Sequence, residues 1–363
     1  MENNYKLEKF ESISIILIIM INKLILNIPF YIVDLTGTGS IINILYIGII
    51  DFILLLAIIK LLNKFQNSDI LDISEFLGGK TLKIIIAIIS ISLFLLVAFI
   101  TLVDFCNVLH TIYFSNFETL YILLFFIIAI LVANLIGLKS IARTTCFIVP
   151  FAVISVVISF FSVWNNFDIE HLTPILGRDY YTTFGLGLSN CFSMYIIIYY
   201  YFIKPLLHDP SEFKKISIIS YIISIILLLL TVISMLTLFN TNSNNEPINS
   251  LFLLVRQIEL GNFLQRVDSI FIFLWILSIF AYLSFIIFLI NRILKKILNI
   301  SNSSMLSYST CSILLGLTLI PINIAKIHFI ESTVYKYVVL GFMFGISFII
   351  LILANIKKLR SKN

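Results

Sequence analysis

Long apolar runs separated by short polar segments dominate the chain. A helix needs about 20 predominantly apolar residues to cross the hydrocarbon core of a bilayer, and the runs reach that length repeatedly. They do not alternate with a period of two, as the strands of a membrane β-barrel would. The pattern predicts an all-α polytopic membrane protein of about ten transmembrane helices. We expect the spans at roughly 12–32, 41–61, 84–106, 119–137, 144–163, 182–203, 216–238, 268–290, 305–322 and 334–355.

Lysines and arginines concentrate in the segments that these spans place on one side of the membrane. Because basic residues favour the cytoplasmic side, both termini are expected to be cytoplasmic. Two outer segments are long enough to hold structure, residues 164–181 and residues 239–267. In the second, apolar residues recur at helical spacing, which indicates a short amphipathic helix in the outer loop.

Composition excludes several classes of function. The chain is 60% hydrophobic and 12% charged, against about a quarter charged in soluble domains. The net charge of +5 comes from loop residues beside the spans, so we expect a lipid bilayer as partner and no nucleic acid. The four cysteines lie singly, and no cysteine or histidine spacing suits a metal. We therefore expect no metal, no cofactor and no enzyme activity.

Two spans contain residues that interrupt a membrane helix. In the first, Asn22, Lys23 and Asn27 precede Pro29, and in the sixth, Gly185, Gly187, Ser189 and Asn190 follow one another closely. Lipid cannot satisfy free backbone groups, so such breaks line protein or a water-filled cavity. Breaks at matching places in oppositely directed halves predict a five-plus-five inverted repeat, 12–163 and 182–355, within one membrane domain, 1–363. Close helix packing through small residues is the alternative.

Lys23 and Asp51 are the two charges expected deepest in the membrane. Each lies about ten residues, or roughly 15 Å, from an end of its predicted span. An unpaired charge at that depth is costly, so we expect a Lys23–Asp51 ion pair between neighbouring helices. The pair could be a helix clamp without a ligand role, or Lys23 could also attract an anionic group of a ligand.

Trp275 and Ser278 fall at helical spacing in the eighth span, followed by Tyr282. This polar-aromatic face could line a cleft or could simply be packing. With the two breaks, it completes the candidate ligand-binding set: Asn22, Lys23, Asn27, Gly185, Gly187, Ser189, Asn190, Trp275 and Ser278.

Two motif regions resemble one known family. The first comprises Arg256-Gln257-Ile258, Gly261, Phe263, Gln265-Arg266-Val267-Asp268, Phe271 and Trp275; the second comprises Gly137, Ile141-Ala142-Arg143, Pro150, Asp168 and Leu172-Thr173-Pro174-Ile175. Together they resemble the endospore germination permeases, the B subunits of Ger-type germinant receptors in the amino acid–polyamine–organocation superfamily.

The resemblance implies a leucine-permease-like fold in the inner membrane of the spore, working beside A and C receptor subunits and binding a small nutrient such as an amino acid. Arg256, Gly261, Arg266, Asp268 and Arg143 would then order a lid or a partner surface. The chain departs from the family by having Asn22 and Leu24 where small glycines are usual. It also lacks acidic residues near Met194–Tyr195 and near Cys146.

Two alternatives to a germinant receptor subunit stay open at this point. One is an ion-coupled amino acid secondary transporter, and the other is a structural subunit that assembles a membrane receptor complex. Asp51 is the only carboxylate that the predicted spans place at the midplane, which weighs against ion coupling.

Overall fold

The computed structural model describes residues 5–162, 168–177, 179–238, 267–300 and 303–361. Every regular element in these ranges is helical, which confirms an all-α polytopic membrane protein. The α-helices are α1 (Lys9–Ile25), α2 (Ile28–Thr36), α3 (Ser40–Leu62), α4 (Ile70–Ile112), α5 (Thr119–Ile136), α6 (Leu138–Ser162), α7 (Ile197–Ile203), α8 (Phe213–Leu238), α10 (Val267–Leu298), α11 (Ser303–Thr318), α12 (Ile324–Phe329), α13 (Lys336–Leu340) and α14 (Ser347–Arg360). Short 3₁₀ or π segments are η1 (Gly37–Gly39), η3 (Ile169–Leu172), η4 (Tyr181–Gly185), η5 (Leu186–Met194), η6 (Lys204–Leu206), η7 (Pro210–Glu212), η8 (Ile330–Tyr335) and η9 (Gly341–Ile346).

Among the described residues, eight helical stretches are long and apolar enough to cross a membrane. All ten predicted spans coincide with helical segments, but α1 and α11 have only 17 and 16 residues. Two boundaries differ from the prediction in a way that matters for the site. The third span belongs to α4, which continues to Ile112, and the tenth belongs to a helical stretch that already begins at Ile324.

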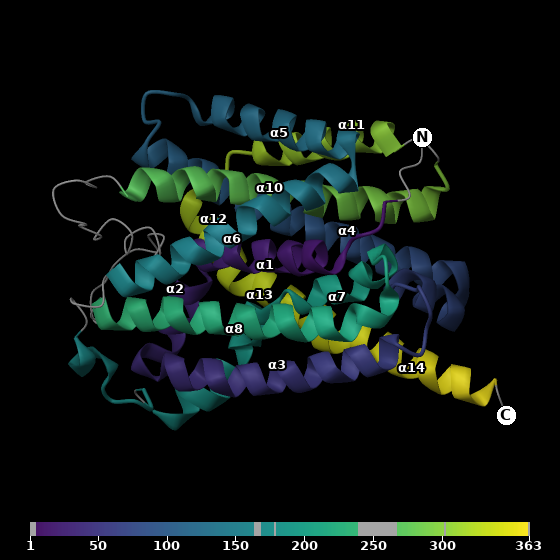
Figure 1. Cartoon of the computed structure of the whole chain (residues 1–363), viewed down its shortest axis with the longest axis horizontal. Coiled ribbons are helices and arrows are strands. Elements are labelled where there is room, and N and C mark those ends of the chain that lie inside the picture. The colour runs from purple at the N-terminus through teal and green to yellow at the C-terminus, as the bar shows by residue number, and fades with distance from the viewer. Residues whose placement is uncertain (1–4, 163–167, 178, 239–266, 301–302, 362–363) are drawn as a thin grey trace.

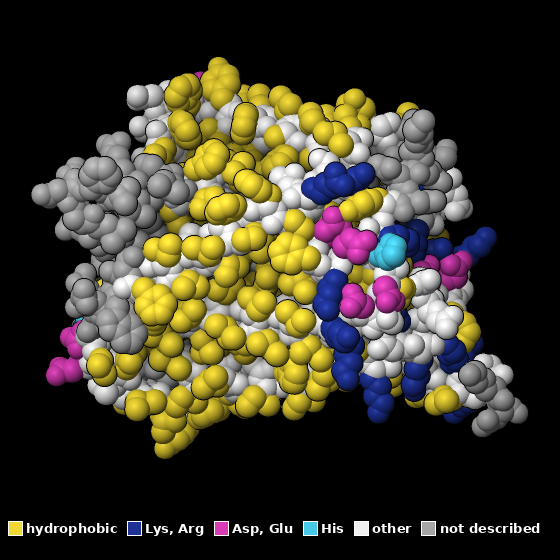
Figure 2. Space-filling model, in the orientation of Figure 1, with side chains coloured by type: hydrophobic (Ala, Val, Ile, Leu, Met, Phe, Trp, Pro, Cys, Tyr) yellow, Lys and Arg dark blue, Asp and Glu magenta, His cyan; other side chains and the backbone are white. Residues whose placement is uncertain are grey.

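Helix α1 lies in the middle of the bundle, where it packs against α6, α8 and α10 (Figure 1). Helices α5 and α11 lie together on one side of it, and α3 lies on the other. In Figure 2, apolar side chains cover the middle of the molecule, and lysines and arginines gather near the end where α14 finishes. We call this the basic end. An apolar belt beside a basic rim is what an integral membrane protein presents to a bilayer.

The predicted break in the first span is present. Helix α1 ends at Ile25, Leu26 has non-helical torsions (φ −74°, ψ −109°), and α2 starts after Asn27. Pro29 lies in the first turn of α2, where its missing N–H costs no helical hydrogen bond. The sixth span is also irregular, because it passes from the π turn of η4 through the 3₁₀ segment η5 to α7.

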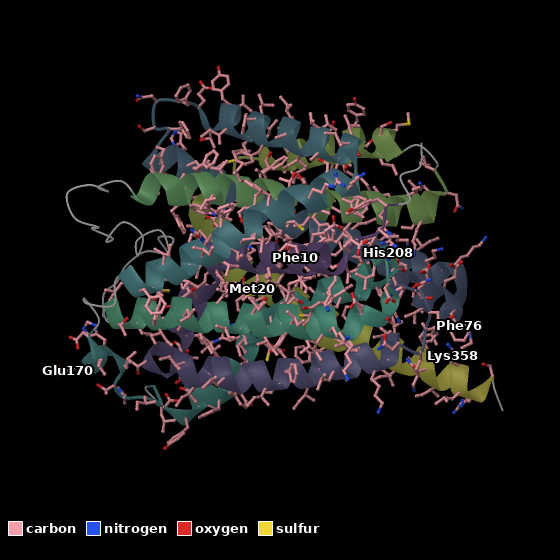
Figure 3. All side chains as sticks on the ribbon, in the orientation of Figure 1. Phe10, Met20, Phe76, Glu170, His208 and Lys358 are labelled. Atoms are coloured by element: carbon pink, nitrogen blue, oxygen red, sulfur yellow. The ribbon has the colours of Figure 1, made fainter. Side chains whose placement is uncertain are left out.

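The orientation of the bundle can be tested by thiol labelling. Figure 3 shows Glu170 at one end of the molecule and Lys358, on α14, at the other. If the basic end is cytoplasmic, Glu170→Cys is labelled by an impermeant reagent added to intact cells, whereas Arg360→Cys is labelled only after permeabilisation. Both substitutions are made in a Cys146→Ser variant, because Cys106, Cys191 and Cys311 are buried and Cys146 is not. The reverse labelling pattern would contradict the expected orientation.

Candidate functional site

Lys23 forms an ion pair with Glu331, and the expected pair with Asp51 is wrong. Lys23 Nζ lies 2.6 Å from Glu331 Oε1, and both side chains are 1% exposed. The Lys23 ammonium also lies over the Tyr335 ring, 5.3 Å from its centroid. Lys23 is in the last turn of α1, so the pair joins the broken first span to η8.

Asn27 extends this pair into a buried network. Its Nδ2 donates to Asp104 Oδ2 at 2.8 Å and to Glu331 Oε2 at 3.0 Å. The Tyr31 hydroxyl donates to the same Glu331 oxygen at 3.1 Å and lies 3.4 Å from His328 Nδ1. Because α1 stops before Asn27, the asparagine can reach both carboxyls at once. We call Lys23, Asn27, Tyr31, Asp104 and Glu331 the central network.

Aromatic side chains lie beside the central network, and those of Tyr199, Tyr282 and Tyr335 are almost wholly buried. The Tyr282 hydroxyl lies close to those of Tyr199 and Thr101. The Tyr335 hydroxyl and Trp275 Nε1, in contrast, have no hydrogen-bond partner among the described residues. Buried polar atoms normally have partners, so these two atoms indicate a place where the polar groups of a ligand can bind.

Three of the predicted residues lie where the last turn of α1 meets α10. Asn22 Nδ2 lies 3.1 Å from both the carbonyl and the hydroxyl of Ser278. Trp275 packs edge-on against Phe105 with ring centroids 4.9 Å apart. These residues therefore fix α10 against α1 and α4 beside the central network.

The predicted residues of the sixth span form a separate cluster. Asn190 Nδ2 donates to Asn43 Oδ1 at 2.9 Å, and Asn43 Nδ2 donates to the Thr183 carbonyl at 2.7 Å. Gly187 is buried against Asn43, whereas Gly185 is exposed and Ser189 bonds only the nearby Leu186 carbonyl. This cluster joins η5 to α3, and in the described part of the chain it has no hydrogen bond to Lys23 or Glu331.

Gly187→Ala is expected to destabilise the protein by about 1–3 kcal/mol. A Cβ at this position would lie 2.3 Å from Asn43 Nδ2, so the asparagine must leave its hydrogen bonds. Gly316→Ala on α11 is the control, because its Cβ would meet nothing within 4 Å. Thermal unfolding of the purified protein in detergent measures both. Equal midpoints for the two variants would contradict the packing of Gly187 on Asn43.

Asp51 is 0% exposed and has no charged partner among the described residues. Its carboxyl lies against the Cys191 thiol, a weak donor, and near Tyr221, whose hydroxyl donates to the Gly48 carbonyl at 2.7 Å.

The family of the chain is shown by its sequence. Residues 6–327 match the model of the spore permease family, described as spore germination protein. The chain belongs to this family. No curated protein matches the chain. The match confirms the resemblance and identifies a germination-related membrane permease. It ends shortly before Glu331, so the ion-pair partner of Lys23 lies outside the matched stretch.

The family motif in the outer loop falls mainly outside the described residues. This holds for Arg256, Gly261 and Arg266, and for the side chain of Asp268 at the start of α10, so their expected role as a lid or partner surface stays a prediction. Arg143 is described. It is exposed on α6 and lies near Tyr5.

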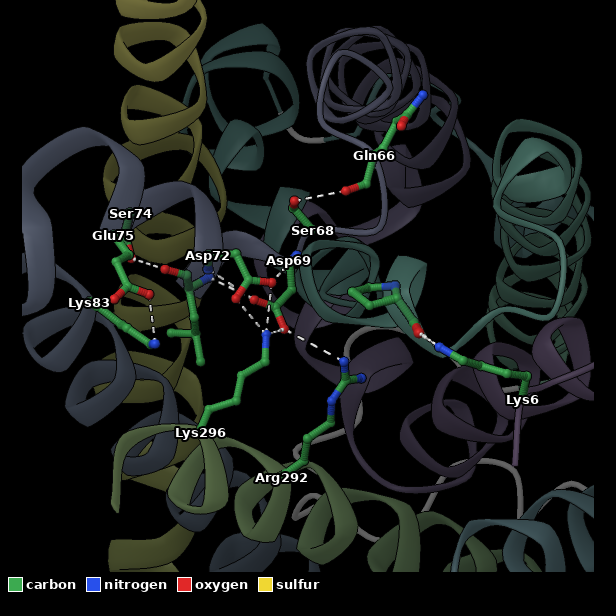
Figure 4. Close-up of polar contacts among 12 residues, drawn as sticks. Lys6, Gln66, Ser68, Asp69, Asp72, Ser74, Glu75, Lys83, Arg292 and Lys296 are labelled. Atoms are coloured by element: carbon green, nitrogen blue, oxygen red, sulfur yellow. Dashed lines mark hydrogen bonds and ion pairs between the residues drawn. The ribbon is translucent and has the colours of Figure 1, made fainter. Parts of the chain in front are cut away.

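A second charged cluster lies at the basic end (Figure 4). Lys296 Nζ lies 2.5 Å from Asp69 Oδ2 and 2.8 Å from Asp72 Oδ2, and Arg292 lies 3.7 Å from Asp69. We call these four residues the basic-end cluster. Asp69 also caps α4 by accepting hydrogen bonds from the backbone N–H groups of Leu71 and Asp72. The cluster therefore fastens the start of α4 to the last turns of α10.

Proposed function

We propose that this spore permease binds a small nutrient, such as an amino acid, at the central network, and serves as the B subunit of a germinant receptor. The observation that carries the proposal is the meeting of an ion pair, a second carboxyl and the unpartnered hydroxyl of Tyr335 near the break between α1 and α2. A zwitterionic nutrient needs both charge signs and hydrogen-bonding groups, and this region offers all of them. We further propose the inner membrane of the spore as its location and A and C receptor subunits as its partners.

A specific observation favours the ion-coupled transporter as second candidate. Glu331 and Asp104 are buried carboxyls beside a broken helix, and coupling ions in transporters use such groups. Asp51 is therefore not the only buried carboxyl, and the number of midplane carboxyls no longer weighs against ion coupling. A purely structural assembly subunit would not need these charges in its interior.

Measurements of nutrient binding and uptake distinguish the receptor subunit from the transporter. The purified protein in liposomes is given a mixture of radiolabelled L-amino acids, with and without an imposed proton or sodium gradient. Saturable binding without accumulation is the expected result for a receptor subunit. Accumulation driven by the gradient would favour the transporter. If neither occurs while the A and C subunits still assemble with the protein, the nutrient-binding proposal is wrong.

Tyr335→Phe is expected to weaken nutrient binding about two- to tenfold without loss of stability. The Tyr335 hydroxyl has no hydrogen-bond partner among the described residues, so removing it breaks no bond, while the ring under Lys23 is kept. Tyr221→Phe is the matched control. Its hydroxyl bonds Gly48, so this variant loses about 1 kcal/mol of stability and keeps its affinity. Binding of the radiolabelled mixture and thermal unfolding report the two effects, and unchanged binding in Tyr335→Phe contradicts a ligand contact there.

A further inference from the structure

The central network contains two carboxyls and only one basic group. Lys23 and Glu331 are each 1% exposed and Asp104 is 4% exposed, so all three are removed from water. Lys23 pairs with Glu331, whereas Asp104 forms no ion pair among the described residues. If all three groups were ionised, one negative charge would remain in the interior without compensation. Such a charge is expensive unless a proton or a cation neutralises it.

Among the described residues, nothing around Asp104 supplies the missing positive charge. Asn27 donates a hydrogen bond but is neutral, and the start of α2 contributes at most about half a charge. His328 is half-buried, lies 3.4 Å from the Tyr31 hydroxyl, and interacts electrostatically with Glu331. The titratable groups around the network are Lys23 on α1, Tyr31 and Asp34 on α2, Tyr282 on α10, His328 on α12, and Glu331 and Tyr335 on η8.

We propose that the central network is a binding site for one proton, held by Asp104 beside the Asn27 amide. Glu331 keeps its charge because Lys23 lies on it, so Asp104 is the carboxyl that takes the proton. An ammonium-bearing nutrient entering the network would compete with this proton. That consequence rests on the proposed function, whereas the proton site itself does not.

The pH dependence of stability gives the first test, with Asp104→Asn as the variant. The folded wild-type protein holds a proton that the unfolded chain loses above about pH 4, so the stability due to Asp104 is complete below that pH and falls as pH rises. Asparagine is neutral at every pH. Between about pH 5 and about pH 9, the wild-type unfolding midpoint should therefore drop relative to that of Asp104→Asn by at least about 2 °C. Asp34→Asn, which changes an exposed carboxyl on α2, should follow the wild type.

Infrared spectroscopy gives a second test that does not need Asp104→Asn to fold. In an Asp51→Asn background, which removes the other buried carboxyl that has no ion pair among the described residues, the protein at neutral pH should show the carbonyl stretch of one protonated carboxylic acid. Asp104→Glu in the same background should shift that band. Absence of any such band would overturn the proposal, as would a band that Asp104→Glu leaves unchanged.

The effect of sodium on stability distinguishes a proton from a metal cation at Asp104. Replacing choline chloride by sodium chloride at constant ionic strength should leave the wild-type midpoint unchanged. Stabilisation by sodium that Asp104→Asn abolishes would show a metal cation in place of the proton and would overturn the proposal. Parallel pH curves for wild type and Asp104→Asn would overturn it as well.

Discussion

Lys23→Met is expected to lower the free energy of unfolding by about 3–5 kcal/mol. Lys23 is the only basic side chain in the central network, and its ammonium lies 2.6 Å from Glu331. Methionine fills a similar volume but leaves Glu331 and Asp104 buried together without a cation. Thermal unfolding of the purified protein, with its level in the membrane, measures the loss.

Glu331→Gln should be milder than Lys23→Met. It removes the direct partner of Lys23 but leaves Asp104 close enough to act on the ammonium, so the interior is then electrically balanced. The double variant Lys23→Met with Glu331→Gln should recover most of the stability that Lys23→Met loses, because removing both members of a buried pair is often nearly neutral. Losses that simply add in the double variant would contradict the ion pair.

Asp51→Asn separates the observed pair from the one expected from sequence. Had Lys23 paired with Asp51, this change would strand the lysine and cost as much as Lys23→Met. Because Lys23 contacts Glu331, and Asp51 has no charged partner among the described residues, we expect the free energy of unfolding to change by less than about 1 kcal/mol.

The charges of the Lys23–Glu331 pair can also be tested for a role in function. A double variant at Lys23 and Glu331 that is stable but no longer supports nutrient-triggered germination would show that the charges serve binding and not only folding.

The spans could be predicted from sequence because each depends on a local property, the length of an apolar run. The break in the first span could be predicted for the same reason, since Asn27 and Pro29 lie two residues apart in the chain and act on the helix that contains them. The burial of Lys23 also follows from its position within an apolar run.

The partner of Lys23 could not be predicted, because pairing depends on which helices meet. Glu331 lies in the polar stretch of α12 and η8, which hydropathy assigns to a loop before the tenth span. The predicted third span ends at residue 106, close to Asp104, whereas α4 continues to Ile112 and places the carboxyl inside the helix. Asn107 and His110 interrupt the apolar residues after Asp104, so hydropathy gives little sign of this extension.

The two predicted breaks were expected to line one cleft, but their side chains form different contacts. Those of the first span meet Glu331, Asp104 and Ser278, whereas Gly187 and Asn190 pack on Asn43 of α3. The expected symmetry between the halves predicts only where helices are irregular. It does not determine which side chains face each other, because that depends on how each irregular segment is rotated about its own axis.

Asp69→Ala is expected to cost about 2–4 kcal/mol, the second largest effect that the structure implies. The Asp69 side chain is 3% exposed, lies 2.5 Å from Lys296, and caps the first turn of α4. Alanine removes both the capping oxygen and the charge. Asp69→Asn keeps a capping oxygen and removes only the charge, so it should lose a smaller part of the stability.

Asp209→Ala is the control that isolates capping, because Asp209 caps η7 through Ser211 but is exposed and forms no ion pair among the described residues. We expect its unfolding midpoint to fall far less than that of Asp69→Ala. Lys296→Met should lose about as much stability as Asp69→Asn. In both variants the cap on α4 is kept, and the interaction between Asp69 and its closest cation is lost. Asp69→Ala and Asp69→Asn could lower the unfolding midpoint equally while Lys296→Met leaves it unchanged. That result would show that the basic-end cluster does not hold α4 to α10.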